Sequence, residues 1–182
     1  MSVRIYGDRP LKTLPGQLTR PTSARVREAV FNIWLSAIDG CRWLDLCAGS
    51  GAMSAEALCR GAASVTAIEQ SGRACSMIRE NLEAVAQEGQ TFQVMRGDVT
   101  RRLKKLQDQQ FDRIYFDPPY ASDLYSPILE AIAGYLLLAP DGELALEHSS
   151  DREPFAAVPP LEICRQKAYG GTAITFYRLV RG

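Results

Sequence analysis

From residue 42 onward, short apolar runs alternate with amphipathic segments, and this alternation limits the possible folds more than any other feature of the chain. The apolar runs predict buried strands at 43–47, 64–69, 91–96 and 111–116. Apolar side chains recurring at helical spacing predict helices over about 52–60, 72–86, 99–106 and 124–138. Repeated strand–helix units imply right-handed crossovers and a parallel sheet covered by helices on both faces. We therefore expect an α/β fold.

The two ends of the chain add shorter elements. A fifth sheet strand is predicted at 142–148, followed by strands 161–168 and 173–180, which join through a Gly170-Gly171 hairpin turn. Alternating residues at 3–7 and 11–14 predict an N-terminal β-hairpin. Thr22 is a plausible N-cap for a helix that ends near Asp39-Gly40. We expect one domain over 1–182, with an N-terminal arm at 1–19 and a core at 22–182.

Composition excludes several other classes of protein. The chain has 182 residues, 46% of them hydrophobic and 23% charged, as in an ordinary globular domain. No apolar run approaches the roughly 18 residues of a membrane span, so we expect a soluble, cytoplasmic protein without membrane contact. Five cysteines without a close pair, together with a single histidine, argue against disulfides and against a metal site. We expect a monomer.

The most informative motif is Asp117-Pro118-Pro119-Tyr120, directly after the strand at 111–116. The prolines end the strand ladder and hold the loop stiff at the edge where an open α/β sheet binds ligands. A carboxylate, a proline carbonyl and an aromatic ring so close together suit the exocyclic amine of a nucleobase. Asp117 and the Pro118 carbonyl can accept its two hydrogens, and Tyr120 can stack on an extruded base. The simpler alternative is a rigid loop with a helix-capping aspartate.

A nucleotide-binding signal precedes this motif. Gly49-Ser50-Gly51 follows the first sheet strand, although Ser54 stands at the third glycine position of the dinucleotide fingerprint. Glu69 ends the second strand, where an acid can take both ribose hydroxyls. These features fit NAD as well as S-adenosylmethionine.

Three further features favour S-adenosylmethionine. Asp45 can meet its cationic end, Asp98 can accept from its adenine amine, and Asp117 to Tyr120 offers a nucleobase site instead of a hydride site. Any one of these acids alone is equally well a capping or turn residue, but acids at successive strand ends point to a shared cofactor.

The chain resembles the RsmD family of small-subunit rRNA guanine-N2 methyltransferases, which are class I S-adenosylmethionine-dependent enzymes. The resemblance rests on Arg20-Pro21-Thr22, Arg25 to Glu28, Phe31-Asn32, Leu44 to Gly51, Ile68-Glu69, Asn81-Leu82, Gly97-Asp98 and Asp117 to Tyr120. It implies a Rossmann-like seven-stranded sheet of order 3-2-1-4-5-7-6, with strand 7 antiparallel. It also implies cofactor contacts from Asp45, Ala48, Gly49, Gly51, Glu69, Gln70, Asp98 and Val99, and target-base contacts from Asp117, Pro118, Pro119 and Tyr120.

The N-terminal segment suggests how RNA is held. Residues 1–27 carry six cations against one acid, whereas the whole chain is neutral. We expect phosphate contacts from Arg4, Arg9, Lys12, Arg20, Arg25 and Arg27. A solvated, mobile terminus would explain the same composition.

Three alternative functions remain open, because the Asp-Pro-Pro-Tyr motif does not itself select guanine. The first is an adenine-N6 methyltransferase of DNA or RNA, although the chain has little room for a separate target-recognition domain. The second is a protein-glutamine methyltransferase, a class that usually resembles Asn-Pro-Pro-Tyr. The third is a non-enzymatic RNA-binding assembly factor. His148 is expected to be a hydrogen-bonded structural residue, and Cys47 is expected not to be a nucleophile.

Overall fold

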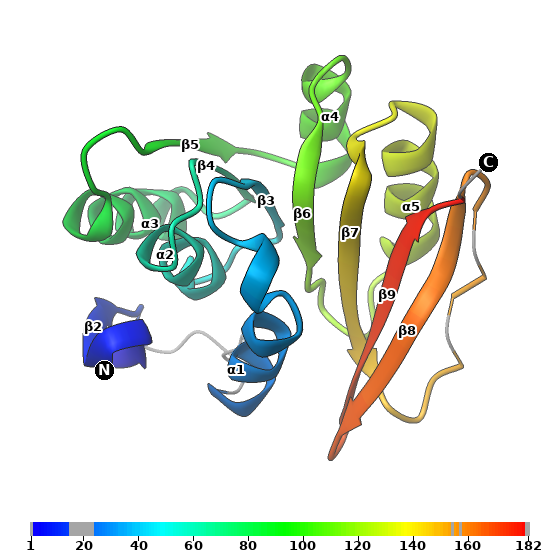
Figure 1. Ribbon diagram of the computed structural model, residues 1–182, viewed down its shortest axis with the longest axis horizontal. Helices are drawn as coiled ribbons and strands as arrows, with labels where there is room; N and C mark the ends of the chain where they lie inside the picture. The colour runs from blue at the N-terminus through cyan, green and yellow to red at the C-terminus, as the bar shows by residue number, and fades with distance from the viewer. Residues whose placement is uncertain (1, 15–23, 154, 157, 181–182) are drawn as a thin grey trace.

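A single mixed sheet forms the centre of the molecule (Figure 1). The structure, a computed structural model, describes residues 2–14, 24–153, 155–156 and 158–180, and within them seven strands form this sheet in the order β5-β4-β3-β6-β7-β9-β8. The strands are β3 (Arg42–Leu46), β4 (Ser64–Glu69), β5 (Thr91–Arg96), β6 (Phe111–Phe116), β7 (Leu138–Ser149), β8 (Leu161–Tyr169) and β9 (Thr172–Leu179). Only β9 runs against its neighbours. The predicted order 3-2-1-4-5-7-6 is confirmed.

Helices cover both faces of the sheet, as the alternation predicts. The helices α1 (Ala24–Ile33), α2 (Ala52–Cys59) and α3 (Gly72–Val85) share one apolar core, to which β3 contributes Trp43. The helices α4 (Val99–Leu103) and α5 (Tyr125–Gly134) share the other core, to which β3 contributes Leu44 and Leu46. Successive side chains of a strand point to opposite faces, so one short strand anchors both cores.

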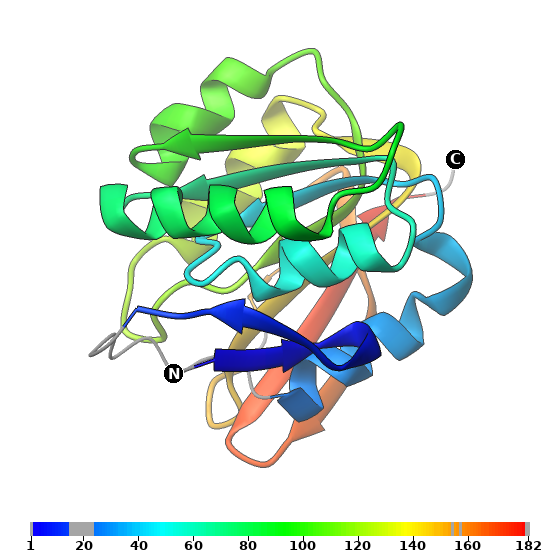
Figure 2. The ribbon, with the colours of Figure 1, turned by 90° about the vertical axis from the view of Figure 1, so that its left-hand side faces the viewer.

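The predicted N-terminal hairpin is present. It consists of β1 (Ser2–Ile5) and β2 (Arg9–Lys12), which pair antiparallel, and the 3-10 turn η1 (Tyr6–Asp8) joins them. The strand β1 is one residue shorter than expected because the turn already starts at Tyr6, whereas β2 has the expected length but begins two residues earlier. Figure 2 shows the hairpin lying below α2 and α3, outside the main sheet. Asn81 of α3 fixes it there by bonding both the N–H and the carbonyl of Lys12, each at 3.0 Å.

Two predicted boundaries are wrong. The helix expected over 124–138 ends at Gly134, and the strand expected from residue 142 begins at Leu138. Leu138 already pairs with Phe111, and a register shift follows before Glu143 pairs with Arg113. Of the apolar run at 136–139, Leu138 and Ala139 therefore belong to the sheet, and Leu136 and Leu137 lie between α5 and β7. The expected N-cap, Thr22, lies outside the described residues, and the last predicted turn of its helix is the separate 3-10 segment η2 (Leu35–Ala37).

A buried ion network ties the hairpin and α1 to α2. Arg27 is only 4% exposed and donates to Glu56 at 2.6 Å and to the Arg4 carbonyl at 2.6 Å. Arg60 donates to the other oxygen of Glu56 at 2.8 Å. The expectation that Arg27 lies on an exposed face for RNA is therefore wrong: the methylene stem packs inward, and Glu56 neutralises the guanidinium.

Replacing Glu56 by Ala should lower the free energy of unfolding by about 3 kcal/mol or more, because two arginines then lose a buried counter-charge. Glu80→Ala is the matched control, since Glu80 pairs with Lys12 at 2.7 Å on the exposed side of α3. It should cost at most about 1 kcal/mol. Urea unfolding measures both, and equal losses would contradict the structural role of the Arg27–Glu56 pair.

Candidate active site

The candidate site lies where the central parallel strands end. Backbone bonds join these ends: the Ala48 N–H donates to the Ile68 carbonyl at 3.0 Å, and the Asp117 N–H donates to the Leu46 carbonyl at 3.4 Å. The loop after β3 therefore lies between the end of β4 and the end of β6. Predicted cofactor residues and the predicted target-base motif meet at one edge of the sheet.

The glycine loop depends on backbone conformations that suit glycine. Gly51 has φ = 74°, and a Cβ there would lie 3.0 Å from Cγ1 of Ile78, so this turn accepts no larger residue without displacement. Gly49 also has a positive φ, and its N–H donates to Glu69 Oε2 at 2.9 Å. Asn81 reaches the same loop, with a 3.4 Å bond to the Ser50 carbonyl. Asn81 thus touches both the hairpin and the loop.

Glu69 is half-buried and already organises this edge. Its Oε1 accepts the Ser71 N–H at 2.8 Å, at the start of α3, while Oε2 holds Gly49. Each carboxylate oxygen can accept more than one bond, so both retain capacity for a ligand hydroxyl. Glu69 therefore supports the loop itself and retains capacity for a ligand, and its expected contact with a ribose stays a prediction.

Asp45 is buried inside the end of β3, with 2% of its surface exposed. Ser54 donates its hydroxyl to Oδ2 at 2.6 Å. Burial raises the pKa of Asp45 to about 7, although the Ser54 bonds act in the opposite direction. Ser54, which departs from the glycine fingerprint, thus serves as the partner of this acid. Within the described residues Asp45 has no cationic partner.

Asp98 follows β5 and caps α4. Its Oδ1 accepts from the Thr100 hydroxyl and from the Arg101 N–H at 3.1 Å, and these bonds hold the pKa of Asp98 below its usual value. The capping alternative raised from the sequence is therefore present here. The adenine contact expected of Asp98 stays a prediction. Among the other predicted cofactor residues, Ala48 is half-buried, Gln70 is exposed and Val99 is buried.

The Asp-Pro-Pro-Tyr loop is held rigidly after β6. The hydroxyl of Tyr120 donates to Glu147 Oε1 at 2.9 Å and lies 2.8 Å from the Thr172 hydroxyl. Burial raises the pKa of this hydroxyl, so Tyr120 stays neutral. Arg152 donates to the Tyr120 carbonyl at 3.3 Å. Asp117 is half-buried at the strand end, Pro118 is buried and Pro119 is exposed.

Sequence reasoning missed Glu147 as a member of this site. Glu147 ends β7 next to β6, is buried, and also accepts the hydroxyl of Tyr115 at 2.5 Å. Its position directly before His148 at a strand end is the only signal the sequence offers. The carboxylate fixes the ring of Tyr120, so the aromatic plate is held before any base arrives.

His148 and Cys47 lie in environments that suit structural roles better than catalytic ones. The ring of His148 bonds the Ser149 carbonyl and the Thr175 hydroxyl, both at 2.9 Å, and burial lowers its pKa. Burial raises the pKa of the Cys47 thiol to about 12, which removes the thiolate that a nucleophile needs. Both expectations, a structural histidine and an unreactive Cys47, agree with these environments.

Across the described ranges no group of three or more His, Cys, Asp or Glu could hold a metal ion, and no helix there is long and apolar enough to cross a membrane.

The predicted RNA-binding cations of the N-terminal segment are mostly engaged. Arg4 pairs with Asp8 and Lys12 with Glu80, each at 2.7 Å, and both pairs are exposed. Arg9 lies 3.5 Å from the Cys59 sulfur, and Arg25 is exposed on α1. Arg20 lies outside the described residues. Exposed pairs exchange partners at little cost, so Arg4 and Lys12 remain accessible to phosphate, whereas Arg27 does not.

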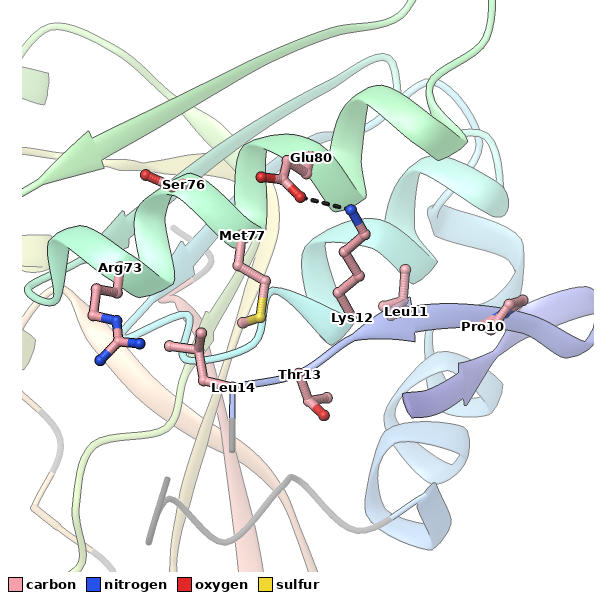
Figure 3. A pocket seen from close by; sticks show the side chains of 9 residues that line it. All are labelled: Pro10, Leu11, Lys12, Thr13, Leu14, Arg73, Ser76, Met77 and Glu80. Carbon is pink, nitrogen blue, oxygen red and sulfur yellow. Dashed lines mark hydrogen bonds and ion pairs between the residues drawn. The ribbon is translucent and has the colours of Figure 1, made fainter. Parts of the chain in front are cut away.

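An open groove of about 740 Å³ separates the hairpin from α3 (Figure 3). Apolar side chains of Leu11, Leu14 and Met77 line it, and the Lys12–Glu80 pair lies at one side. Arg73, the second residue of α3, stands at its other end. None of the predicted cofactor or target-base residues lines this groove.

Comparison with known proteins identifies the class first. A structure of the Escherichia coli protein YhhF, whose name proposes a methyltransferase, matches with a TM-score of 0.85 and 27% identity over 98% of both chains. The sheet order and the glycine loop are those of a class I methyltransferase, so the predicted fold is confirmed.

The family follows from the sequence matches. The family model described as Conserved hypothetical protein 95 matches residues 3–178, and the chain belongs to this family. The Bacillus subtilis protein YlbH, whose name proposes an rRNA methyltransferase, is 34% identical over 93% of both sequences. The Haemophilus influenzae protein named ribosomal RNA small subunit methyltransferase D is 28% identical over 96% of this chain and 89% of its own length. The resemblance to the RsmD family is confirmed.

The raised pKa of Asp45 can be tested by measuring the free energy of unfolding at different pH values. Its folded pKa of about 7 exceeds the usual 3.8, so between about pH 4 and 7 the unfolded chain releases a proton that the folded chain keeps. Wild-type stability therefore falls with rising pH in this window because of Asp45. Asp45→Asn should gain stability relative to wild type from pH 4 to pH 8, as measured by urea unfolding.

Asp112→Asn is a control of opposite sign. Arg42 bonds hold the pKa of Asp112 below its usual value, so this acid stabilises the fold above its unfolded pKa and loses that effect as pH falls. Its variant should be destabilised most at neutral pH. A pH-independent difference between Asp45→Asn and wild type would contradict the burial effect at Asp45.

Proposed function

We propose that this protein transfers a methyl group from S-adenosylmethionine to the exocyclic N2 amine of a guanine in small-subunit rRNA, on an assembled particle. The observation that carries this proposal is the hydrogen bond from the Asp117 N–H to the Leu46 carbonyl, which joins the end of β6 to the end of β3. It places a nucleotide-binding loop and a rigid Asp-Pro-Pro-Tyr loop side by side. A nucleotide cofactor and a nucleobase can therefore meet at this edge.

The residues at this edge fit S-adenosylmethionine. Asp45 is a buried acid with no cationic partner in the described part of the chain, and a cationic ligand end would stabilise its ionised form. Glu69 offers acceptors for ribose hydroxyls, and Asp98 retains an oxygen for adenine. When bound, S-adenosylmethionine supplies an electrophilic methyl group on sulfur.

The residues of the Asp-Pro-Pro-Tyr loop act on the amine of the target base. An aromatic amine is a weak nucleophile because its lone pair is shared with the ring. Asp117 and the Pro118 carbonyl accept its hydrogens, which raises electron density on nitrogen and stabilises the positive charge that develops there. Tyr120, fixed by Glu147 and Thr172, offers its ring as a stacking plate for the extruded base.

The substrate class rests on the relatives. Proteins named ribosomal RNA small subunit methyltransferase D match almost the whole chain, and this favours rRNA over DNA or protein. The exposed cations Arg4, Arg9, Lys12 and Arg25 support contact with phosphates, and Arg20 joins this proposal from the sequence alone.

Incubation with methyl-labelled S-adenosylmethionine and small ribosomal subunits from a strain lacking this gene tests the proposal. Nucleoside analysis should find label in N2-methylguanine of the small-subunit rRNA. Label in N6-methyladenine would instead support an adenine-N6 methyltransferase, and label in protein glutamine would support a protein-glutamine methyltransferase. Label in no fraction would support a non-enzymatic RNA-binding assembly factor. Deproteinised rRNA, tested in parallel, should accept less label than the particle.

Replacing Asp117 by Ala should cut turnover about 100-fold or more, the usual cost of losing an acceptor that acts in the transition state. Affinity for S-adenosylmethionine should stay near that of wild type, because Asp117 contacts the amine. Asp123→Ala is the control, an exposed acid in the same loop that should retain full turnover. Near-normal turnover by the Asp117 variant would contradict amine activation.

A further inference from the structure

A second basic region, unrelated to the N-terminal arm, surrounds one edge of the sheet. Six cations lie on α3, β5, α4 and the 3-10 segment η3 (Lys104–Leu106), and we call them the cationic strip: Arg79, Arg96, Arg101, Arg102, Lys104 and Lys105. Over residues 94–106 the chain has five cations and a single acid, Asp98, which is occupied in capping α4. The sequence charge count assigned basic character to the N-terminus and overlooked this segment.

Three of these guanidinium groups lie on or beside β5. The Arg79 guanidinium donates to the Val94 carbonyl at 3.2 Å, so it lies over β5. The guanidinium of Arg96 lies against Gly72, where a Cβ would be 3.0 Å from its Cζ, and that of Arg102 lies against Gly97. Figure 2 shows α3 and β5 on the side facing the viewer, with α4 behind β5, so the strip passes around the sheet edge from one face to the other.

The strip lacks the neutralising partners that several other described surface cations have. Within the described residues, none of its six members has a carboxylate within 4.0 Å, whereas Arg4, Lys12, Arg42, Arg165 and Arg178 each form an ion pair. Cations held close together without counter-charges repel one another. A polyanion would relieve this repulsion.

Protection of an exposed strand edge does not explain the strip. Charged side chains commonly guard edge strands against aggregation, and β5 is an edge strand. The opposite edge strand, β8, meets the same need with mixed charges, because Arg165 pairs with Glu143, and Arg178 of β9 pairs with Glu162. The β5 edge differs because its cations form no such ion pairs within the described residues.

The strip begins at the candidate active site. Arg96 is paired in register with Glu69, the proposed ribose acid, and Arg101 follows Asp98 by three residues. A nucleic acid bound along the β5 edge would thus reach the carboxyl edge of the sheet. We propose that the cationic strip binds the phosphate backbone of the small-subunit rRNA flanking the target guanine; this inference rests on the proposed function.

The test compares two triple variants with the same loss of charge. Arg101→Gln/Lys104→Gln/Lys105→Gln removes three exposed strip cations, and Arg165→Gln/Lys167→Gln/Arg178→Gln removes three from the β8 edge. Binding to small subunits from the strain lacking this gene is measured across a salt series. The strip variant should flatten the slope of log affinity against log salt by about 2, since each lost phosphate contact removes about 0.7–0.9. The β8 variant should keep the wild-type slope.

Both variants should retain wild-type thermal stability and S-adenosylmethionine affinity. The double variant Lys104→Gln/Lys105→Gln leaves Arg101, which lies close to Asp98, unchanged. It should show about two-thirds of the slope change of the triple strip variant. An unchanged slope in the strip variant, or equal changes in both triples, would overturn the proposal. Failure of the proposed function has a different signature: wild-type protein would bind the particle with the strip-dependent slope and transfer no methyl group to its rRNA.

Discussion

Parallel pairing of β3 with β4 on one side and with β6 on the other is the constraint on which the rest of the structure depends. It brings Asp45, Glu69 and Asp117, which are distant in sequence, to one edge of one sheet. Because each strand is buried on both faces, a shift in register would misplace both apolar cores as well as the site. Packing energy therefore maintains the geometry of the acids.

The site divides into two halves with different physical demands. On the side of β4 and β5, Glu69 and Asp98 use part of their bonding capacity to hold local backbone and leave the rest for a flexible ligand. On the side of β6 and β7, Glu147 locks the Tyr120 ring through a buried bond. Under the proposed function, such preorganisation limits the entropy lost when an extruded base stacks on the ring.

The strand and helix segments, the hairpin and the acids at the strand ends were predictable because period and spacing report directly on them, whereas the strand order followed from the resemblance to a known family. The residues that support the acids were not, because their roles depend on partners brought together by the fold. Arg27 looks like a surface cation until Glu56 is seen beside it, and Ser54 looks like a missing glycine until it bonds Asp45. Net charge by segment located the N-terminal cations, yet only three-dimensional contacts distinguish the paired ones from those of the strip.

The central claim is that a cofactor at the glycine loop faces a base amine held by Asp117. A crystal structure with S-adenosylhomocysteine and a short guanosine-containing RNA tests it most directly. We expect the ribose on Glu69, the sulfur beside the Asp45–Gly51 segment, and the guanine N2 atom about 2.7–3.2 Å from an Asp117 oxygen, with the base stacked on Tyr120. A ligand bound away from the glycine loop, or a guanine amine held by other residues, would contradict the account.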